Sequence, residues 1–189
     1  GKKPETGEIS VNGLDLNALA TLAIHLPFSA AQRELLAQSQ PRGTLSDFSL
    51  KWEGDWSAPR SYAAKGRFAG LGVKPFALKE GGSKLPGFSG LSGNFDAGEK
   101  GGALALNAHG VSAAFSEVFA EPLAFDTLTA QASWKARADG VEVRLDSANF
   151  SNAHLAGQAH GRFFHVPGMP GEIDLTGQLT RADARQVRR

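Results

Sequence analysis

Cysteine is absent from this chain of 189 residues. Its absence excludes disulfides, thiolate nucleophiles and cysteine-ligated zinc. It does not identify the compartment, because periplasmic proteins can also lack cysteine. The sequence therefore offers neither a covalent cross-link nor a soft metal site.

Long apolar runs and an excess of one charge are also missing. No stretch approaches the roughly 18–20 apolar residues of a membrane span, and no signal-peptide pattern opens the chain. Lys+Arg is 20 and Asp+Glu is 19, whereas a nucleic-acid binder usually carries a basic excess, so we expect no nucleic-acid partner. The opening GKKPETG and the closing RADARQVRR look like cuts through a longer polypeptide, so we interpret the chain as a fragment of a much longer protein.

Residues 1–42 are predicted to form a short strand followed by a helical hairpin. Residues 8–16 alternate and read as the strand, and Asp15 or Asn17 can cap a first helix that Pro27 ends. Ser29 and Gln32 have the spacing of a capping box for a second helix, which extends to about residue 39. A hydrophobic content of 41% argues against disorder in the chain as a whole.

From residue 43 onward the apolar period changes to 2, which indicates β-strands. In residues 127–137 the apolar positions are all even-numbered, and polar residues fill the odd-numbered ones. The Asp139-Gly140 pair that follows is a strong signal for a hairpin turn. Similar strand–turn–strand segments start at Leu91, Leu128 and Asp174. The sequence thus predicts a mainly β fold, with a repetitive antiparallel meander over residues 43–189.

No constellation of residues points to catalysis. His154 and His160 lie on the polar side of one strand, about 20 Å apart at roughly 3.3 Å per residue, which is too far for a shared metal ion. No Gly-x-Ser-x-Gly elbow occurs, the acidic residues fall at turns or on outward faces, and the glycine-rich turns lack the Lys-Ser/Thr of a phosphate loop. We predict that the chain is not an enzyme and carries no metal ion and no cofactor.

Several blocks of the chain resemble the AsmA-like superfamily of Gram-negative envelope proteins, and in particular its very long members. The blocks are EPLAFDTLTAQASWKARADGVEVRLDSANFSNAHLAGQAHGRF (121–163), LPGFSGLSGNFDAGEKGGALAL (85–106), PGEIDLTGQLTRADARQVRR (170–189) and the helical hairpin from residue 15. Each motif is a degenerate β pattern, so the resemblance depends on the order of the blocks. It spans the chain from about residue 15 to the C-terminus.

This resemblance implies a curved sheet or groove in the periplasm, belonging to a parent protein anchored in the inner membrane. The groove would carry phospholipid towards the outer membrane, with acyl chains on its apolar face and adjacent β-repeats of the parent chain as further partners. The residues that would face lipid are those of apolar parity. They are Leu104, Leu106, Leu128, Ala130, Ala132, Trp134, Val141, Val143, Leu145, Leu155, Ile173, Leu175 and Leu179.

The residues themselves leave a second architecture open. One-faced alternation needs something to cover the apolar face, and a closed β-sandwich acting as a scaffold or binding module in the envelope would supply protein instead of lipid. Trp52 and Trp134 have apolar parity and indicate core or groove lining, whereas Trp56 follows a strand and is free to stack on a ligand such as a sugar. The small residues Ala130, Ala132, Gly157, Ala159 and Gly161 favour the lipid interpretation, because a tightly packed sandwich usually has larger side chains.

Overall fold

The computed structural model describes residues 6–25, 28–55, 58–77, 84–115, 121–165 and 171–182. The chain is mainly β, as predicted, and forms an open antiparallel meander preceded by two short helices. The N-terminal elements are β1 (Thr6–Val11), β2 (Leu14–Asp15), α1 (Leu16–Leu22), the 3-10 turn η1 (Ala23–His25) and α2 (Ala30–Ser39). The strands that follow are β3 (Arg42–Asp55), β4 (Ala58–Val73), β5 (Phe76–Ala77), β6 (Lys84–Leu85), β7 (Gly87–Gly98), β8 (Gly101–Ala114), β9 (Leu123–Ala136), β10 (Val141–Ser151), β11 (Leu155–His165) and β12 (Glu172–Ala182).

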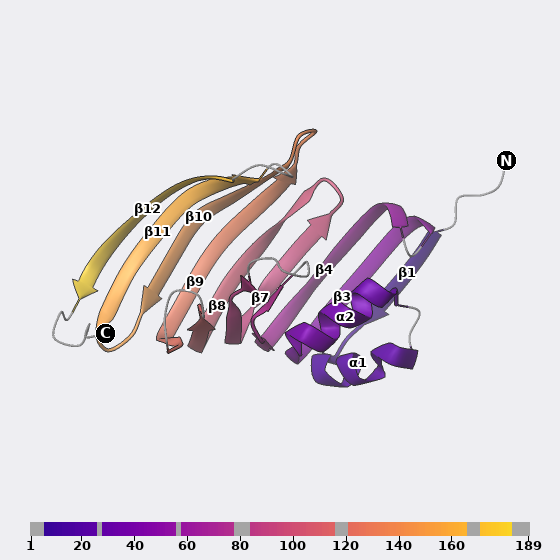
Figure 1. Ribbon diagram of the computed structural model, residues 1–189, viewed down its shortest axis with the longest axis horizontal. Coiled ribbons are helices and arrows are strands. Elements are labelled where there is room, and N and C mark those ends of the chain that lie inside the picture. The colour runs from indigo at the N-terminus through magenta and orange to yellow at the C-terminus, as the bar shows by residue number, and fades with distance from the viewer. Residues whose placement is uncertain are drawn as a thin grey trace.

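One sheet contains almost all of these strands. Its order is β1-β3-β4-β7-β8-β9-β10-β11-β12, with β2 also paired to β3, while β5 and β6 pair only with each other. Neighbouring strands are therefore also successive along the chain from β7 onward, which is the meander that the alternating segments predict. Figure 1 shows the strands side by side from β1 at one edge to β12 at the other. β1 pairs with β3 over six residues, so the N-terminal strand belongs to the same sheet.

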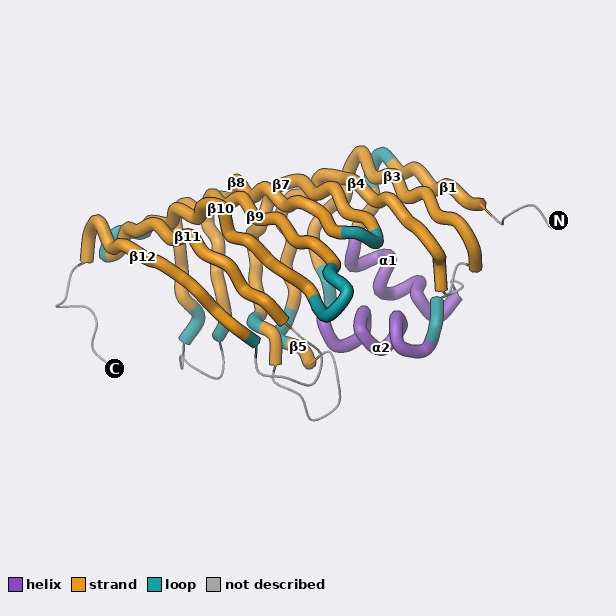
Figure 2. The backbone as a smooth tube through the Cα atoms, turned by 90° about the horizontal axis from the view of Figure 1, so that it is seen from above, coloured by secondary structure: helices purple, strands orange, loops and turns teal. Residues whose placement is uncertain are grey.

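The two predicted helices are present and begin where their caps place them. The Asp15 carboxylate accepts a hydrogen bond from the Ala18 amide at 2.9 Å and starts α1. Ser29 and Gln32 form the expected capping box at the start of α2. Gln40, in the left-handed conformation, ends α2. Figure 2 shows both helices under the arch that the strands make, near the β1–β4 side of the sheet.

A row of glycines with positive φ crosses four neighbouring strands. Gly43 of β3, Gly70 of β4, Gly90 of β7 and Gly110 of β8 have φ between 61° and 108°. A Cβ atom at Gly90 would lie 2.6 Å from the carbonyl oxygen of Gly110, so the two backbones approach closely there. Only glycine adopts this conformation without strain. The strands consequently change direction along this row, and the residues that face inward change parity.

Burial across the β8 kink shows the change of parity directly. Ala108, before Gly110, is 1% exposed, and Val111, after it, is also 1% exposed although the two are three residues apart. Val111 pairs with Phe125, whose ring meets that of Phe150 edge to face at 5.7 Å between centroids. The best-buried apolar residues of the sheet therefore lie at the glycine row, where the sheet bends.

The apolar side of the sheet is its concave side. Within the described residues the large sheet is a single layer, yet most side chains of apolar parity in its interior are half-buried while most of those of the other parity are exposed. In one bent layer, side chains crowd on the inside of the curve and spread on the outside, so the half-buried set lies inside. We call this the inner face, and the opposite side the outer face (Figure 2).

The hairpin turn predicted at Asp139-Gly140 is confirmed. Arg137 and Gly140 exchange backbone hydrogen bonds of 2.8 and 3.4 Å across it. Trp134 and Trp52 have the expected apolar parity, since Trp134 pairs with Val143 and Gly102, and Trp52 pairs with Gly7. Trp56 lies outside the described residues.

Candidate functional site

Strand register assembles the apolar positions of successive strands into continuous rows on the inner face. Leu104 pairs with Ala132, and Ala132 pairs with Leu145. Leu106 likewise pairs with Ala130 in the next row. The rows and the alternation along each strand place all the sequence-predicted apolar residues on this face. They are Leu104, Leu106, Leu128, Ala130, Ala132, Trp134, Val141, Val143, Leu145, Leu155, Ile173, Leu175 and Leu179.

The inner face also contains aromatic residues that the sequence patterns do not identify. Phe68, Phe95, Phe150 and Phe163 pair with inner-face residues of their neighbours. A register shift in β10 puts Phe150 out of simple alternation with the first half of its strand, whereas Phe68 alternates with Ala64 and Gly66, which are too small to mark an apolar face. The signal that could have found them is the glycine on the neighbouring strand, since Gly93 faces Phe68 and Gly157 faces Phe150.

Bulky inner-face side chains occupy the space over glycines of adjacent strands. A Cβ atom at Gly102 would overlap the Trp134 ring, and one at Gly7 would overlap the Trp52 ring. At Gly157 a Cβ atom would lie 2.7 Å from the Phe150 ring and 3.1 Å from Leu179. The glycines of the inner face therefore leave room for the large side chains of neighbouring strands.

The outer face carries charged side chains, and several of them pair across strands. Glu8 binds Lys51 at 3.2 Å and Arg162 lies 3.4 Å from Asp174. Asp47 also pairs with Arg67. Both partners of each pair are more than half exposed, so each pair contributes at most a fraction of a kcal/mol. This face gives the sheet a solvated side without an excess of one sign.

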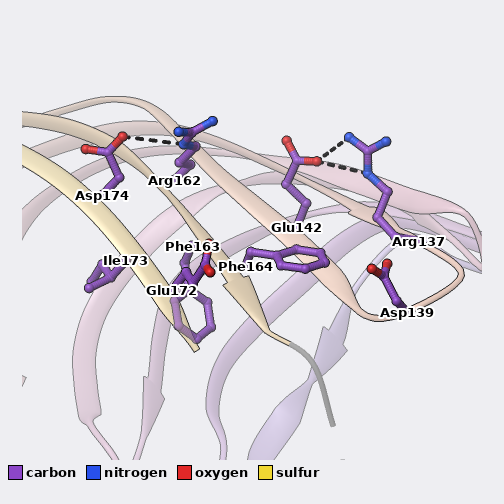
Figure 3. A pocket seen from close by; sticks show the side chains of 9 residues that line it. All are labelled: Arg137, Asp139, Glu142, Arg162, Phe163, Phe164, Glu172, Ile173 and Asp174. Atoms are coloured by element: carbon purple, nitrogen blue, oxygen red, sulfur yellow. Dashed lines mark hydrogen bonds and ion pairs between the residues drawn. The ribbon is translucent and has the colours of Figure 1, made fainter. Parts of the chain in front are cut away.

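A surface hollow of about 830 Å³ lies where β10 and β12 begin and β11 ends. Figure 3 shows the Arg162–Asp174 and Arg137–Glu142 pairs on one side of the strands, with Phe163 and Ile173 on the other. The hydrogen bond and the charge of Arg137 lower the pKa of the partly exposed Glu142 carboxyl. The basic groups of the hollow are thus bound to carboxylates, and the residues that line it include no nucleophile beside a general base.

In the described ranges no helix is long and apolar enough to cross a membrane. Across the same part of the chain no group of three or more His, Asp or Glu side chains is arranged to hold a metal ion. His154 and His160 are both exposed.

These features define a class of protein: a one-layer antiparallel β-meander, curved around an apolar inner face, with a helical pair near one edge. The family model described as YhdP protein matches residues 2–189. The chain therefore belongs to the YhdP family, which confirms the resemblance to AsmA-like proteins and indicates a protein of the bacterial envelope with a role related to lipid transport. Neither a curated protein nor a solved structure matches the chain.

Proposed function

We propose that this chain is a segment of an envelope-spanning lipid-transport protein, and that its inner face shields phospholipid acyl chains between the inner and outer membranes. The single observation that carries the proposal is the continuous apolar inner face. Within the described residues it extends across strands from β1 to β12 without a second sheet packed on the strands β8–β12. Large exposed apolar surfaces are rare on soluble proteins unless something binds there.

The energetics of such a surface suit acyl chains. Moving a chain from water onto apolar side chains is favourable by about 0.8 kcal/mol for each CH₂ that becomes buried. The gain is non-directional, so a two-chain lipid needs no specific polar contact to bind. This free-energy gain also changes little as an acyl chain slides from one strand to the next, because paired positions on successive strands carry similar apolar residues, Leu or Ala.

Small residues on the inner face also support a sliding ligand. Ala130 and Ala132 of β9 and Gly157, Ala159 and Gly161 of β11 leave little to obstruct movement along the face. The Trp134 ring occupies the space that Gly102 leaves on the neighbouring strand. A packed core of a closed sandwich would be expected to use larger, interlocking side chains.

Family membership supports the rest of the proposal. The segment acts in the periplasm, without catalysis and without a cofactor, as part of a parent chain anchored in the inner membrane. Adjacent β-repeats of the same parent would continue the surface on either side. The lipid, not the protein, supplies the cover of the inner face.

A pair of neighbouring residues on β9 allows a sharp test. Ala132 lies on the inner face between Leu104 and Leu145, and Gln131 lies beside it on the outer face. A photoreactive benzophenone amino acid at position 132 is expected to cross-link phospholipid from vesicles of bacterial phospholipid, and the same group at position 131 is not.

Charge substitutions at the same two positions provide a second readout. Ala132→Glu is expected to lower the phospholipid retained by the detergent-free protein in native mass spectrometry by at least about tenfold, and Gln131→Glu by less than about twofold. Circular dichroism of both variants checks that the sheet is intact. Equal cross-linking at 131 and 132, or a parent protein that takes up no phospholipid, contradicts the proposal and would favour a protein-binding module.

A further inference from the structure

The outer face carries one uncharged polar residue on each of five neighbouring strands, in a row that crosses the strands (Figure 1). Each member pairs in register with the next, and all are exposed. At about 4.8 Å between strands, the row is roughly 19 Å long. We call it the amide row. Its members are Asn107 of β8, Thr129 of β9, Asn149 of β10, Gln158 of β11 and Gln178 of β12.

The amide row contributes few hydrogen bonds to the fold. The Gln158 side-chain nitrogen donates to the Gln178 side-chain oxygen at 3.0 Å. Within the part of the chain that the structure describes, the side chains of Asn107, Thr129 and Asn149 make no hydrogen bond. A row that only stabilised the sheet would bond from strand to strand along its whole length, as stacked amides do. Most of its donors and acceptors are therefore available to a partner.

The surroundings of the amide row indicate an uncharged partner. On β9, β11 and β12 the residues two positions before and after the row lie on the same face, and none is Asp, Glu, Lys or Arg. A nucleic acid requires cationic side chains. The centre of a protein interface is usually rich in aromatic residues, methionine and arginine. The amide row has none of these.

The spacing of the amide row suits a linear sugar polymer. The strands set an interval of about 4.8 Å between its members, which is close to the length of one β-1,4-linked pyranose unit. An extended polypeptide advances by about 3.3 Å per residue and does not keep step with the strands. Each side-chain amide both donates and accepts hydrogen bonds, as the hydroxyl and acetamido groups of a sugar do. The row therefore presents a repeating pattern that a repeating glycan can match.

We propose that the amide row binds an uncharged linear glycan laid across the strands, with one sugar unit over each strand. The Asn and Gln side chains exchange hydrogen bonds with its hydroxyl and acetamido groups. Each contact is weak because water competes for it, so affinity arises from several contacts in register. The glycan lies on the opposite side of the sheet from the acyl chains, and the two ligands do not compete. Such a contact fixes the segment to a polysaccharide of the bacterial envelope.

Oligomers of β-1,4-linked N-acetylglucosamine, from two to six units long, provide an uncharged probe of defined length. Each oligomer is titrated into the ¹⁵N-labelled protein, and backbone and side-chain amide resonances are followed. The five-unit oligomer is expected to shift the side-chain resonances of the Asn and Gln residues of the amide row. It should bind at least about tenfold more tightly than the two-unit oligomer. The sixth unit should add less than about twofold, because the row in this chain spans five strands.

Two asparagine substitutions on the outer face provide a matched pair of variants. Asn149→Ala removes the centre of the amide row and is expected to weaken binding of the five-unit oligomer by at least about fivefold. Asn94→Ala alters an exposed asparagine of β7 that lies outside the row, and is expected to change binding by less than about twofold. Backbone amide spectra check that the sheet is intact in both variants.

Several results would overturn the proposal. They are affinity that does not depend on oligomer length, equal losses in the two variants, shifts confined to the inner face, and tighter binding of the anionic glycan polygalacturonate than of the neutral oligomer. Binding of no oligomer also overturns it and favours a protein partner for this face. Phospholipid retention is expected to be unchanged by Asn149→Ala, so this proposal and the lipid proposal fail separately.

Discussion

The indole of Trp134 on β9 lies across the backbone of Gly102 on β8, directly opposite it in the register. The two residues pack as a pair, because a side chain at position 102 would overlap the Trp134 ring. Trp52 over Gly7 repeats the arrangement at the other end of the sheet. Glycines that weaken an isolated strand therefore have a packing role in this sheet.

Substitution of Gly102 tests this relationship. Gly102→Val must displace the Trp134 ring and also approach the Asp96 carbonyl oxygen, which lies 2.6 Å from the position of its Cβ atom. We expect a loss of about 1–3 kcal/mol in the free energy of unfolding, measured by urea denaturation. Gly177→Val is the matched control, since it meets open space and is expected to change stability by less than about 1 kcal/mol. Equal losses in the two variants contradict the packing argument.

The glycine row predicts a different kind of sensitivity. Gly90 and Gly110 both have positive φ, at 78° and 64°, but only at Gly90 would a Cβ atom press on backbone, 2.6 Å from an oxygen. Gly110→Ala is expected to lower stability by about 1–2 kcal/mol from the conformation alone. Gly90→Ala should lower stability further than Gly110→Ala does, because the Gly110 carbonyl group must also move. Thermal melts of the two variants give the order, and the reverse order contradicts the geometry.

The Arg137–Glu142 pair predicts a pH dependence. Arg137 lowers the pKa of Glu142 in the folded protein through a hydrogen bond and its charge. A carboxyl with a lowered pKa stabilises the fold when ionised, and the contribution disappears as the pH falls through the folded-state pKa. The difference in stability between the parent and Glu142→Gln should therefore be present at neutral pH and vanish once the pH has fallen below the lowered pKa of Glu142. Because the pair is exposed, high salt should reduce the difference, and a difference that grows as the pH falls is incompatible with the pairing.

Loss of the N-terminal cap of α2 is expected to destabilise this helix and to leave the sheet unaffected. Ser39 is its one buried residue and Leu36 is half-buried, so tertiary packing contributes little to it. Ser29→Ala removes the capping hydrogen bond and should destabilise the helix by about 1 kcal/mol. Faster amide exchange is expected in residues 30–39 with unchanged exchange in β8–β10. Asn12→Ala, at an exposed bend after β1, is the control, and faster exchange of the β8–β10 amides in Ser29→Ala would contradict a local effect.

Much of this architecture could be predicted because its signals are local. The capping residues Asp15, Ser29 and Gln32 begin the helices where the sequence places them. The alternation in residues 127–137 and the Asp139-Gly140 turn predict β9, β10 and their hairpin. The side of the sheet on which Trp134 lies could be predicted from its even-numbered position alone, because successive side chains of a strand point to opposite sides.

Other features depend on contacts between distant parts of the chain. On strand β4 the inner-face residues before Phe68 are the small Ala64 and Gly66, so the alternation carries little apolar signal and Phe68 is recognised as an inner-face residue by its pairing with Gly93. The glycine row arises from four strands in register, and no single segment contains that information.

The sequence by itself determined which residues are apolar on one face of each strand, where the helices begin, and the absence of a cysteine site. Only the tertiary structure decided that these faces meet on the concave side of a single open sheet and that bulky rings lie over neighbouring glycines. The physical reason is that alternation specifies which face of a strand is apolar but not what packs against that face. A β-sandwich and an open groove therefore have the same sequence pattern. Register and curvature, set by pairing between strands, distinguish the two.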